Sequence, residues 1–309
     1  MDLHAAWLFE ETLAFSIKCL LILSFRFFCL GLFTGNSMTV YFIGAGPGDP
    51  DLMTIKGMKA LQACSVVLYA GSLIPREVIA SIEDKAEAIY DTASMNLDET
   101  TAVIKKAAKE GKDVARLQSG DPALYGAIGE QIRRIEMLGI DYQVIPGVSA
   151  VAASAALLGK ELTLSGVSQT VIMTRYEGKT PFPERERLPA LAQSGATLAI
   201  HLGVTKIHKI VEELMPHYGE DCPVAVCYRV GWPDQDYVVG TLTDIVAKVR
   251  AKKFTLTSLI LVGRVLDTDD FNDSYLYDKN QPNLFRKKQR SSRQSNVHSK
   301  SSSLNETKD

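Results

Sequence analysis

Short apolar runs rich in β-branched residues alternate with helical patterns from Thr39 onward, and this alternation limits what the chain can fold into. It is typical of an α/β fold with a largely parallel sheet and crossover helices. The predicted strands are residues 40–43, 65–69, 114–117, 142–145, 170–173, 197–200, 224–228, 237–239 and 259–262. The predicted helices are residues 55–62, 99–109, 123–138, 148–158, 206–214 and 242–252, with Thr54 and Asp98 as the first two N-caps.

The pattern restarts after Gly159, and residues 232–234 fit the turn of a hairpin. We therefore predict two α/β domains, residues 38–160 and 161–267, with a boundary near residues 159–165. Small-molecule sites usually lie in clefts between domains, so we expect the site there.

Both ends of the chain differ from its middle. Residues 1–37 contain an apolar run, but Arg26 inside it costs about 2.5–3.5 kcal/mol on the insertion scale, and no signal-peptide pattern is present. We expect this segment to be upstream sequence or a misassigned start before Met38; a peripheral anchor and a membrane segment remain open alternatives. Residues 268–309 are predicted to be a polar tail, disordered over 286–309.

Charge and cysteine content exclude several classes of function. The net charge of -2, with both signs mixed along the chain, gives no basic surface for nucleic acid. The cysteines are Cys19, Cys29, Cys64, Cys222 and Cys227. They form no C-x-x-C pair, so neither a disulfide framework nor a protein-bound metal is predicted, and a reducing, cytoplasmic compartment fits best.

The first predicted strand ends in a glycine-rich turn, residues 44–50. It departs from the dinucleotide fingerprint because Pro47 and Pro50 interrupt the helix start and no carboxylate ends the second strand. Asp49 and Asp51 would also repel a pyrophosphate. A ligand that carries positive charge fits this turn better.

Two more loops, residues 119–122 and 146–150, also follow predicted strands. Any one of them alone is more often a simple turn. Because the carboxyl ends of parallel strands share one edge of a sheet, we expect the three loops to converge on one ligand site.

These three loops resemble those of the tetrapyrrole methylases. The resemblance lies in residues 40–52, 116–122 and 145–150, and it extends from about Met38 to about Asp267. Residues 68–73, 120–128, 174–181 and 228–234 are similar to the family members that methylate C-11 of precorrin-4, with or without cobalt in the ring.

The resemblance implies a homodimer of two-domain chains, with S-adenosylmethionine held folded in the interdomain cleft. Carried over by position, the cofactor-binding residues would be Pro47, Ser119, Gly120, Asp121, Leu124, Ser149, Ala150, Leu202 and Val230. For Leu202 and Val230, ordinary core packing is an equal alternative.

The tetrapyrrole that the resemblance implies as substrate carries many carboxylates, which favour arginine donors. Arg175 and Arg229 are the candidates, with Trp232 as a stacking surface; surface ion pairs and packing within the hairpin are the alternatives. No general base is nominated, and His201 is interpreted as a hydrogen-bonded structural residue. Any cobalt would arrive inside the substrate.

The predicted function is therefore methyl transfer from S-adenosylmethionine to C-11 of precorrin-4 or cobalt-precorrin-4. Another tetrapyrrole C-methyltransferase is the main alternative. A nicotinamide oxidoreductase and a membrane-tethered binding module remain less favoured alternatives.

Overall fold

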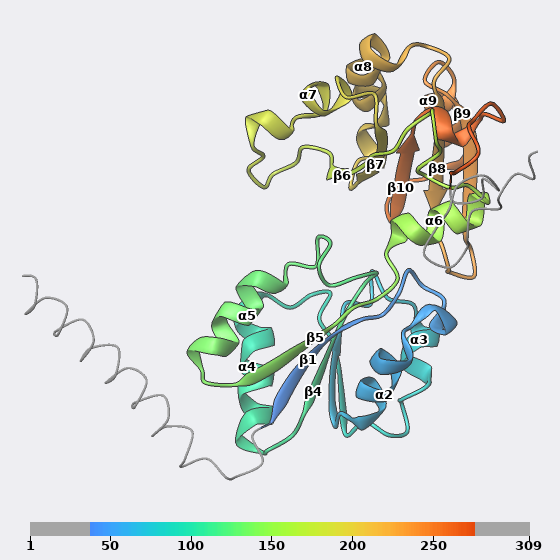
Figure 1. The fold of residues 1–309 in the computed structure, drawn as a ribbon. Helices are drawn as coiled ribbons and strands as arrows, with labels where there is room; N and C mark the ends of the chain where they lie inside the picture. The colour runs from blue at the N-terminus through green and yellow to red at the C-terminus, as the bar shows by residue number, and fades with distance from the viewer. Residues whose placement is uncertain (1–37, 276–309) are drawn as a thin grey trace, which may run out of the picture.

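The computed structural model describes residues 38–275, which form two groups of helices around two five-stranded sheets (Figure 1). The strands of the first sheet are β1 (Thr39–Gly44), β2 (Val66–Tyr69), β3 (Ala88–Asp91), β4 (Val114–Gln118) and β5 (Asp141–Ile145). Every pair in this sheet is parallel, in the order β3-β2-β4-β1-β5. The predicted parallel α/β architecture is confirmed here, although β3 was not predicted.

Helices cover both faces of the first sheet. They are α2 (Ile55–Ala63), α3 (Arg76–Ala80), α4 (Leu97–Lys109) and α5 (Ile128–Met137). Leu61 of α2 and Val78 of α3 pack on the face that carries Ile43. Ile104 of α4 and Ile135 of α5 pack on the opposite face. The strand ends that bear the predicted loops are therefore held between two apolar layers.

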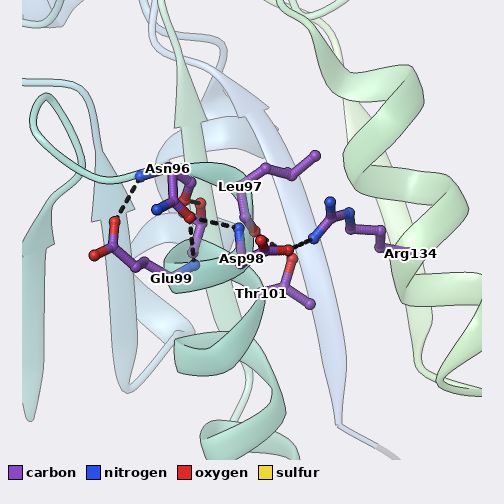
Figure 2. A network of polar contacts seen from close by, with 7 residues as sticks. Asn96, Leu97, Asp98, Glu99, Thr101 and Arg134 are labelled. Carbon is purple, nitrogen blue, oxygen red and sulfur yellow. Dashed lines mark hydrogen bonds and ion pairs between the residues drawn. The ribbon is translucent and has the colours of Figure 1, made fainter.

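The first cap prediction is confirmed, since Thr54 accepts a hydrogen bond from the N–H of Gly57. The second is wrong, because Asn96 rather than Asp98 caps α4. Asn96 accepts from the N–H groups of Asp98 and Glu99, and the Glu99 carboxylate accepts from the N–H of Asn96 (Figure 2). Together these two side chains satisfy more of the unpaired backbone N–H groups at the helix N-terminus than Asp98 would satisfy alone.

Helix α5 begins at Ile128, five residues after its predicted start. Tyr125 and Ala127 have φ values of 57° and 48°, which a right-handed helix does not allow. The carboxylate of Asp121 accepts the N–H of Ala123 at 2.8 Å, which stabilises a turn instead of a first helical turn.

The second sheet is mostly antiparallel. Its strands are β6 (Val171–Arg175), β7 (Thr197–His201), β8 (Pro223–Tyr228), β9 (Asp236–Thr241) and β10 (Ser258–Val262), in the order β6-β7-β10-β8-β9. Only β6 and β7 pair in parallel. The prediction of a largely parallel sheet is therefore wrong for this half, because strands such as β8 and β9 are joined by a hairpin rather than a crossover helix. The predicted hairpin itself is confirmed.

Helices α7 (Leu188–Ala192), α8 (Ile207–Tyr218) and α9 (Ile245–Lys252) pack on one face of the second sheet. The other face receives α6 (Ala150–Leu158), whose Val151 packs with Ala199 and Leu261. In Figure 1, α6 lies beside β8 and β10. Helix α6 precedes the predicted boundary at residues 159–165 yet packs on the second sheet; the boundary stays a prediction.

The predictions for residues 1–37, and for the tail beyond residue 275, lie outside the described residues. Between residues 38 and 275, no helix is long and apolar enough to cross a membrane.

Candidate active site

Three loops meet at the carboxyl edge of the first sheet: the β1 loop (residues 44–50), the β4 loop (residues 119–122) and the β5 loop (residues 146–150). Gly46 and Gly120 exchange backbone hydrogen bonds of 2.7 and 3.3 Å. The carboxylate of Asp121 accepts the N–H of Gly147 at 2.9 Å. The predicted convergence of the three loops is confirmed.

Glycine permits this convergence. A Cβ atom on Gly44 would lie 2.5 Å from the Cα of Gly147, and one on Gly147 would lie 2.2 Å from the carbonyl oxygen of Gly120. Real Cβ contacts are never this short, so only glycine allows the backbones of the three loops to approach so closely.

A cavity of about 390 Å³, called here the cleft cavity, opens where these loops face the second sheet. Its wall includes all nine residues predicted to bind the cofactor: Pro47, Ser119, Gly120, Asp121, Leu124, Ser149, Ala150, Leu202 and Val230. The structure thus brings residues from three loops of the first half and two strand ends of the second half to one place. Cofactor binding by these residues stays a prediction.

The charged residues on the wall of the cleft cavity indicate whether an anionic or a cationic ligand fits. Asp121 is the one acidic residue on its wall within residues 38–275, and no lysine or arginine lines it. Asp121 already accepts two backbone N–H groups, from Ala123 and Gly147. A pyrophosphate would therefore meet no cationic side chain here, whereas a cationic ligand would meet no repelling one.

Left-handed backbone also gathers at the cleft cavity. Tyr125, Leu202 and Thr257 line it with φ values of 57°, 55° and 48°. The N–H of Arg229, which has a φ of 46°, donates to the carbonyl oxygen of Thr257 at 2.9 Å. Such conformations cost about 1–2 kcal/mol per residue and cluster at functional sites. Leu202 is also 72% exposed, which excludes ordinary core packing for this residue.

Several residues of the wall were not predicted. Ser72 and Leu73 come from the loop after β2, Tyr125 follows the β4 loop, and residues 255–259 precede and begin β10. Ser72, Leu73 and Tyr125 lie within stretches that carry the family resemblance, so the resemblance could have identified them from the sequence. Residues 255–259 carry no comparable motif in the sequence.

The three residues predicted to bind substrate do not line the cleft cavity. Arg175 donates to the carbonyl oxygens of Thr180 and Pro181 at 3.2 and 3.0 Å. Arg229 pairs with Asp234 at 3.1 Å and lies over the Trp232 ring, 4.0 Å from its centroid. Both guanidinium groups are thus engaged within the second half, and substrate binding by these residues stays a prediction.

Trp232 instead packs against the β1 loop. A Cβ on Gly48 would lie 2.4 Å from Cδ1 of Trp232, and both residues line a second cavity of about 280 Å³. The indole therefore joins the hairpin of the second half to the glycine-rich turn of the first.

His201 lies on the wall of the cleft cavity, with its ring centroid 4.9 Å from that of Tyr125. Its interpretation as a hydrogen-bonded residue is wrong at Nε2, which is buried and has no hydrogen-bond partner among the described residues. Burial lowers the pKa of His201 to about 4, so the imidazole is neutral at neutral pH.

This burial predicts a pH-dependent loss of stability. Unfolding exposes His201 and restores its ordinary pKa of about 6.5, so the unfolded chain binds more protons between pH 6.5 and 4. The free energy of unfolding should therefore fall as the pH drops through this range, by about 2–3 kcal/mol from this group. Urea unfolding of the wild type and of His201→Gln at pH 7.5 and 4.5 measures the difference.

The variant should lose less stability than the wild type between the two pH values. His208→Gln, at an exposed position on α8, is the matched control and should behave like the wild type. Equal losses in all three proteins would contradict the assignment to His201.

Two α/β halves with a small-molecule cavity between them are typical of an enzyme. The family model of the Tetrapyrrole (Corrin/Porphyrin) Methylases matches residues 39–246, and the chain belongs to this family. It is 56% identical over 249 residues to a precorrin-4 C(11)-methyltransferase of Pseudomonas aeruginosa, covering 81% of this chain and 99% of the relative. It is 49% identical over 253 residues to a cobalt-precorrin-4 C(11)-methyltransferase of Methanocaldococcus jannaschii, covering 82% and 97%.

Solved structures show the same fold. A cobalt precorrin-4 methyltransferase superposes with a TM-score of 0.72 at 43% identity, covering 75% of this chain and 97% of the other. A uroporphyrin-III C-methyl transferase of Thermus thermophilus, complexed with S-adenyl homocysteine, superposes with a TM-score of 0.60 at 28% identity, covering 74% and 98%.

Proposed function

We propose that this chain methylates C-11 of precorrin-4 or cobalt-precorrin-4, with S-adenosylmethionine as the methyl donor. The observation that carries the proposal is that nine positions separated by up to 183 residues in the sequence, from Pro47 to Val230, line one cavity. The similarity to relatives that act on precorrin-4 and cobalt-precorrin-4 supports the choice of substrate. The homodimer implied by the family resemblance and the cytoplasmic location inferred from the cysteine content belong to the same proposal.

The cleft cavity suits the proposed methyl donor. Its volume of about 390 Å³ lies within the usual range for small-molecule sites. Ser119 and Ser149 offer hydroxyl groups, while Leu124, Leu202 and Val230 offer apolar surface. A sulfonium in this cavity would meet the carboxylate of Asp121 and the neutral imidazole of His201, with no lysine or arginine among the described residues of the wall.

S-adenosylmethionine, when bound, supplies an electrophilic methyl group for the ring carbon. The chain needs to contribute orientation, which lowers a barrier of this kind by several kcal/mol. Backbone hydrogen bonds join the β1 loop to the β4 loop, and the Asp121 carboxylate joins the β4 loop to the β5 loop, so the three loops provide a rigid wall for this purpose. Leu124, Leu202 and Val230 would exclude water from the reacting atoms.

The alternatives are less well supported. A nicotinamide oxidoreductase needs a site for pyrophosphate, and the described wall of the cleft cavity offers no cationic side chain for it. A methylase acting at another ring carbon would share the cofactor loops. The uroporphyrin-III C-methyl transferase is 28% identical, against 56% for the precorrin-4 relative, which favours C-11.

Incubation of the full chain with S-adenosylmethionine and either metal-free precorrin-4 or cobalt-precorrin-4 tests the proposal. Mass spectrometry should detect one added methyl group on at least one of them, and NMR of the product should place it on C-11. The same assay decides which form is the substrate. No methyl transfer to either ring, or transfer to another carbon, would overturn the proposed substrate.

Isothermal titration with S-adenosylhomocysteine and with NADH tests the enzyme class independently of the substrate. The nucleoside should bind and the nicotinamide cofactor should not. The opposite result would exclude the methyltransferase.

A further inference from the structure

One flank of the cleft cavity is formed by a loop to which no cofactor role is assigned. This β2 loop (residues 70–73) follows β2 and contributes Ser72 and Leu73 to the wall. In the sheet order β3-β2-β4-β1-β5, the three loops proposed to hold the cofactor follow β4, β1 and β5. The β2 loop therefore extends the wall on the far side of β4, beside the loops proposed to hold the cofactor.

The chemistry of this flank suits a tetrapyrrole. Leu73 is 46% exposed and presents apolar surface to the cavity, while Ser72 adds a hydroxyl group beside it. The apolar face of the macrocycle can pack on Leu73, and Ser72 can donate a hydrogen bond to one of the carboxylates at its edge. The position of the β2 loop would then affect how the macrocycle lies against the methyl donor.

A carboxylate on the neighbouring strand fixes this loop. Oδ1 of Asp91, the last residue of β3, accepts the N–H of Gly71 and the N–H of Ala93, both at 2.9 Å. These bonds lower the pKa of Asp91, so it is ionised at neutral pH. Thr92 adds two hydrogen bonds to the carbonyl oxygen of Tyr69, of 2.7 Å from its N–H and 3.1 Å from its hydroxyl.

The fit between the carboxylate and the loop is tight. A Cβ on Gly71 would lie 2.4 Å from Oδ2 of Asp91, so only glycine allows the carboxylate to approach the backbone. At its other end the loop is anchored by Ile74, which is buried and donates its N–H to the carbonyl oxygen of Ala70 at 3.0 Å. The loop is held at both ends, and Asp91 holds its centre.

We propose that Asp91 is a positioning residue for the tetrapyrrole: it fixes the β2 loop, which forms the substrate-facing flank of the cleft cavity. This inference rests on the proposed function. Asp91 acts through the loop, so its loss should weaken the productive binding of the macrocycle and leave the methyl donor site intact.

Asp91→Ala and Asp91→Asn in the full chain separate this role from a general structural one. The alanine variant loses both hydrogen bonds, and its KM for the tetrapyrrole should rise about tenfold while the Kd for S-adenosylhomocysteine stays within about twofold. The asparagine variant keeps an Oδ1 acceptor for both N–H groups, so its KM should stay near that of the wild type. Asp98→Ala, which removes the ion pair with Arg134 on α5, is the matched control and should change neither constant.

An unchanged KM in Asp91→Ala, or equal losses of tetrapyrrole and S-adenosylhomocysteine binding, would overturn the positioning role. A loss in Asp91→Asn as large as that in the alanine variant would do the same. Should Asp91→Ala not fold, Gly71→Ala tests the same contact, because its Cβ would push the Asp91 carboxylate and the loop apart and should raise the KM in the same way.

Failure of the proposed function gives a different result. In that case the wild type methylates neither precorrin-4 nor cobalt-precorrin-4, and absorbance titration against protein saturated with S-adenosylhomocysteine shows whether either ring binds. Binding to the wild type that is weakened in Asp91→Ala would still support the positioning role. Binding that is equal in both proteins, or absent from both, would overturn it.

Discussion

Replacing Ser119 with tryptophan should abolish methyl transfer and weaken S-adenosylhomocysteine binding by at least about a hundredfold, or about 3 kcal/mol. Ser119 lies directly after β4, on the wall of the cleft cavity. An indole at this position fills space that the methyl donor would occupy in a cavity of about 390 Å³. Isothermal titration with S-adenosylhomocysteine measures the loss, and the mass assay measures methyl transfer.

Ser119→Ala is the matched control, because it removes the hydroxyl group without filling the cavity. Its affinity should fall by at most about tenfold, the value of one or two hydrogen bonds. Thermal unfolding of the tryptophan variant should stay within a few degrees of the wild type, since the side chain can extend into open space. Tight binding by a folded Ser119→Trp would remove the β4 loop from the site.

Gly147→Ala should cost about 3 kcal/mol or more of unfolding free energy and should also weaken S-adenosylhomocysteine binding. The added Cβ would lie 2.2 Å from the carbonyl oxygen of Gly120 and 2.8 Å from the Cα of Gly44. Both are backbone atoms, so no change of rotamer relieves the overlap, and overpacking of this kind is costly. The β1, β4 and β5 loops would have to separate, and urea unfolding with parallel calorimetric titration measures both effects.

Gly129→Ala provides the comparison, because a Cβ there meets nothing within 4 Å and the residue lies inside α5. That substitution, in the first turn of α5, should leave the stability unchanged or raise it by up to about 0.5 kcal/mol, as alanine favours a helix more than glycine does. If Gly147→Ala had the same free energy of unfolding as the wild type, the three loops could separate without loss of stability.

The sequence allowed prediction of the loops at the strand ends because parallel strands place their carboxyl ends together, whatever the details of packing. The same reasoning could not find β3, an edge strand of four partly buried or exposed residues whose apolar pattern is weak. It also placed the start of α5 too early, since tyrosine and alanine rarely adopt the left-handed backbone that Tyr125 and Ala127 have.

The arginine predictions show a further limit of sequence reasoning. Arg175 and Arg229 are the right residue type for carboxylates and lie near the second half of the cleft. Whether a guanidinium is free depends on tertiary contacts, here the carbonyl oxygens of Thr180 and Pro181 and the carboxylate of Asp234. His201 differs in the opposite sense, because it was expected to be hydrogen-bonded and its Nε2 has no partner among the described residues. That too depends on the surrounding side chains, which the sequence alone does not place.

The β5 loop and the start of α6 join the two halves of the molecule, and this joining segment lines the cleft cavity. Gly147 is tied to the first half by Asp121, whereas Val151, four residues later, packs in the core of the second half. Ser149 and Ala150 lie between these two attachments and line the cleft cavity. A hinge motion between the halves would therefore rotate the backbone near Val148 and change the shape of the wall at which the methyl donor is proposed to bind.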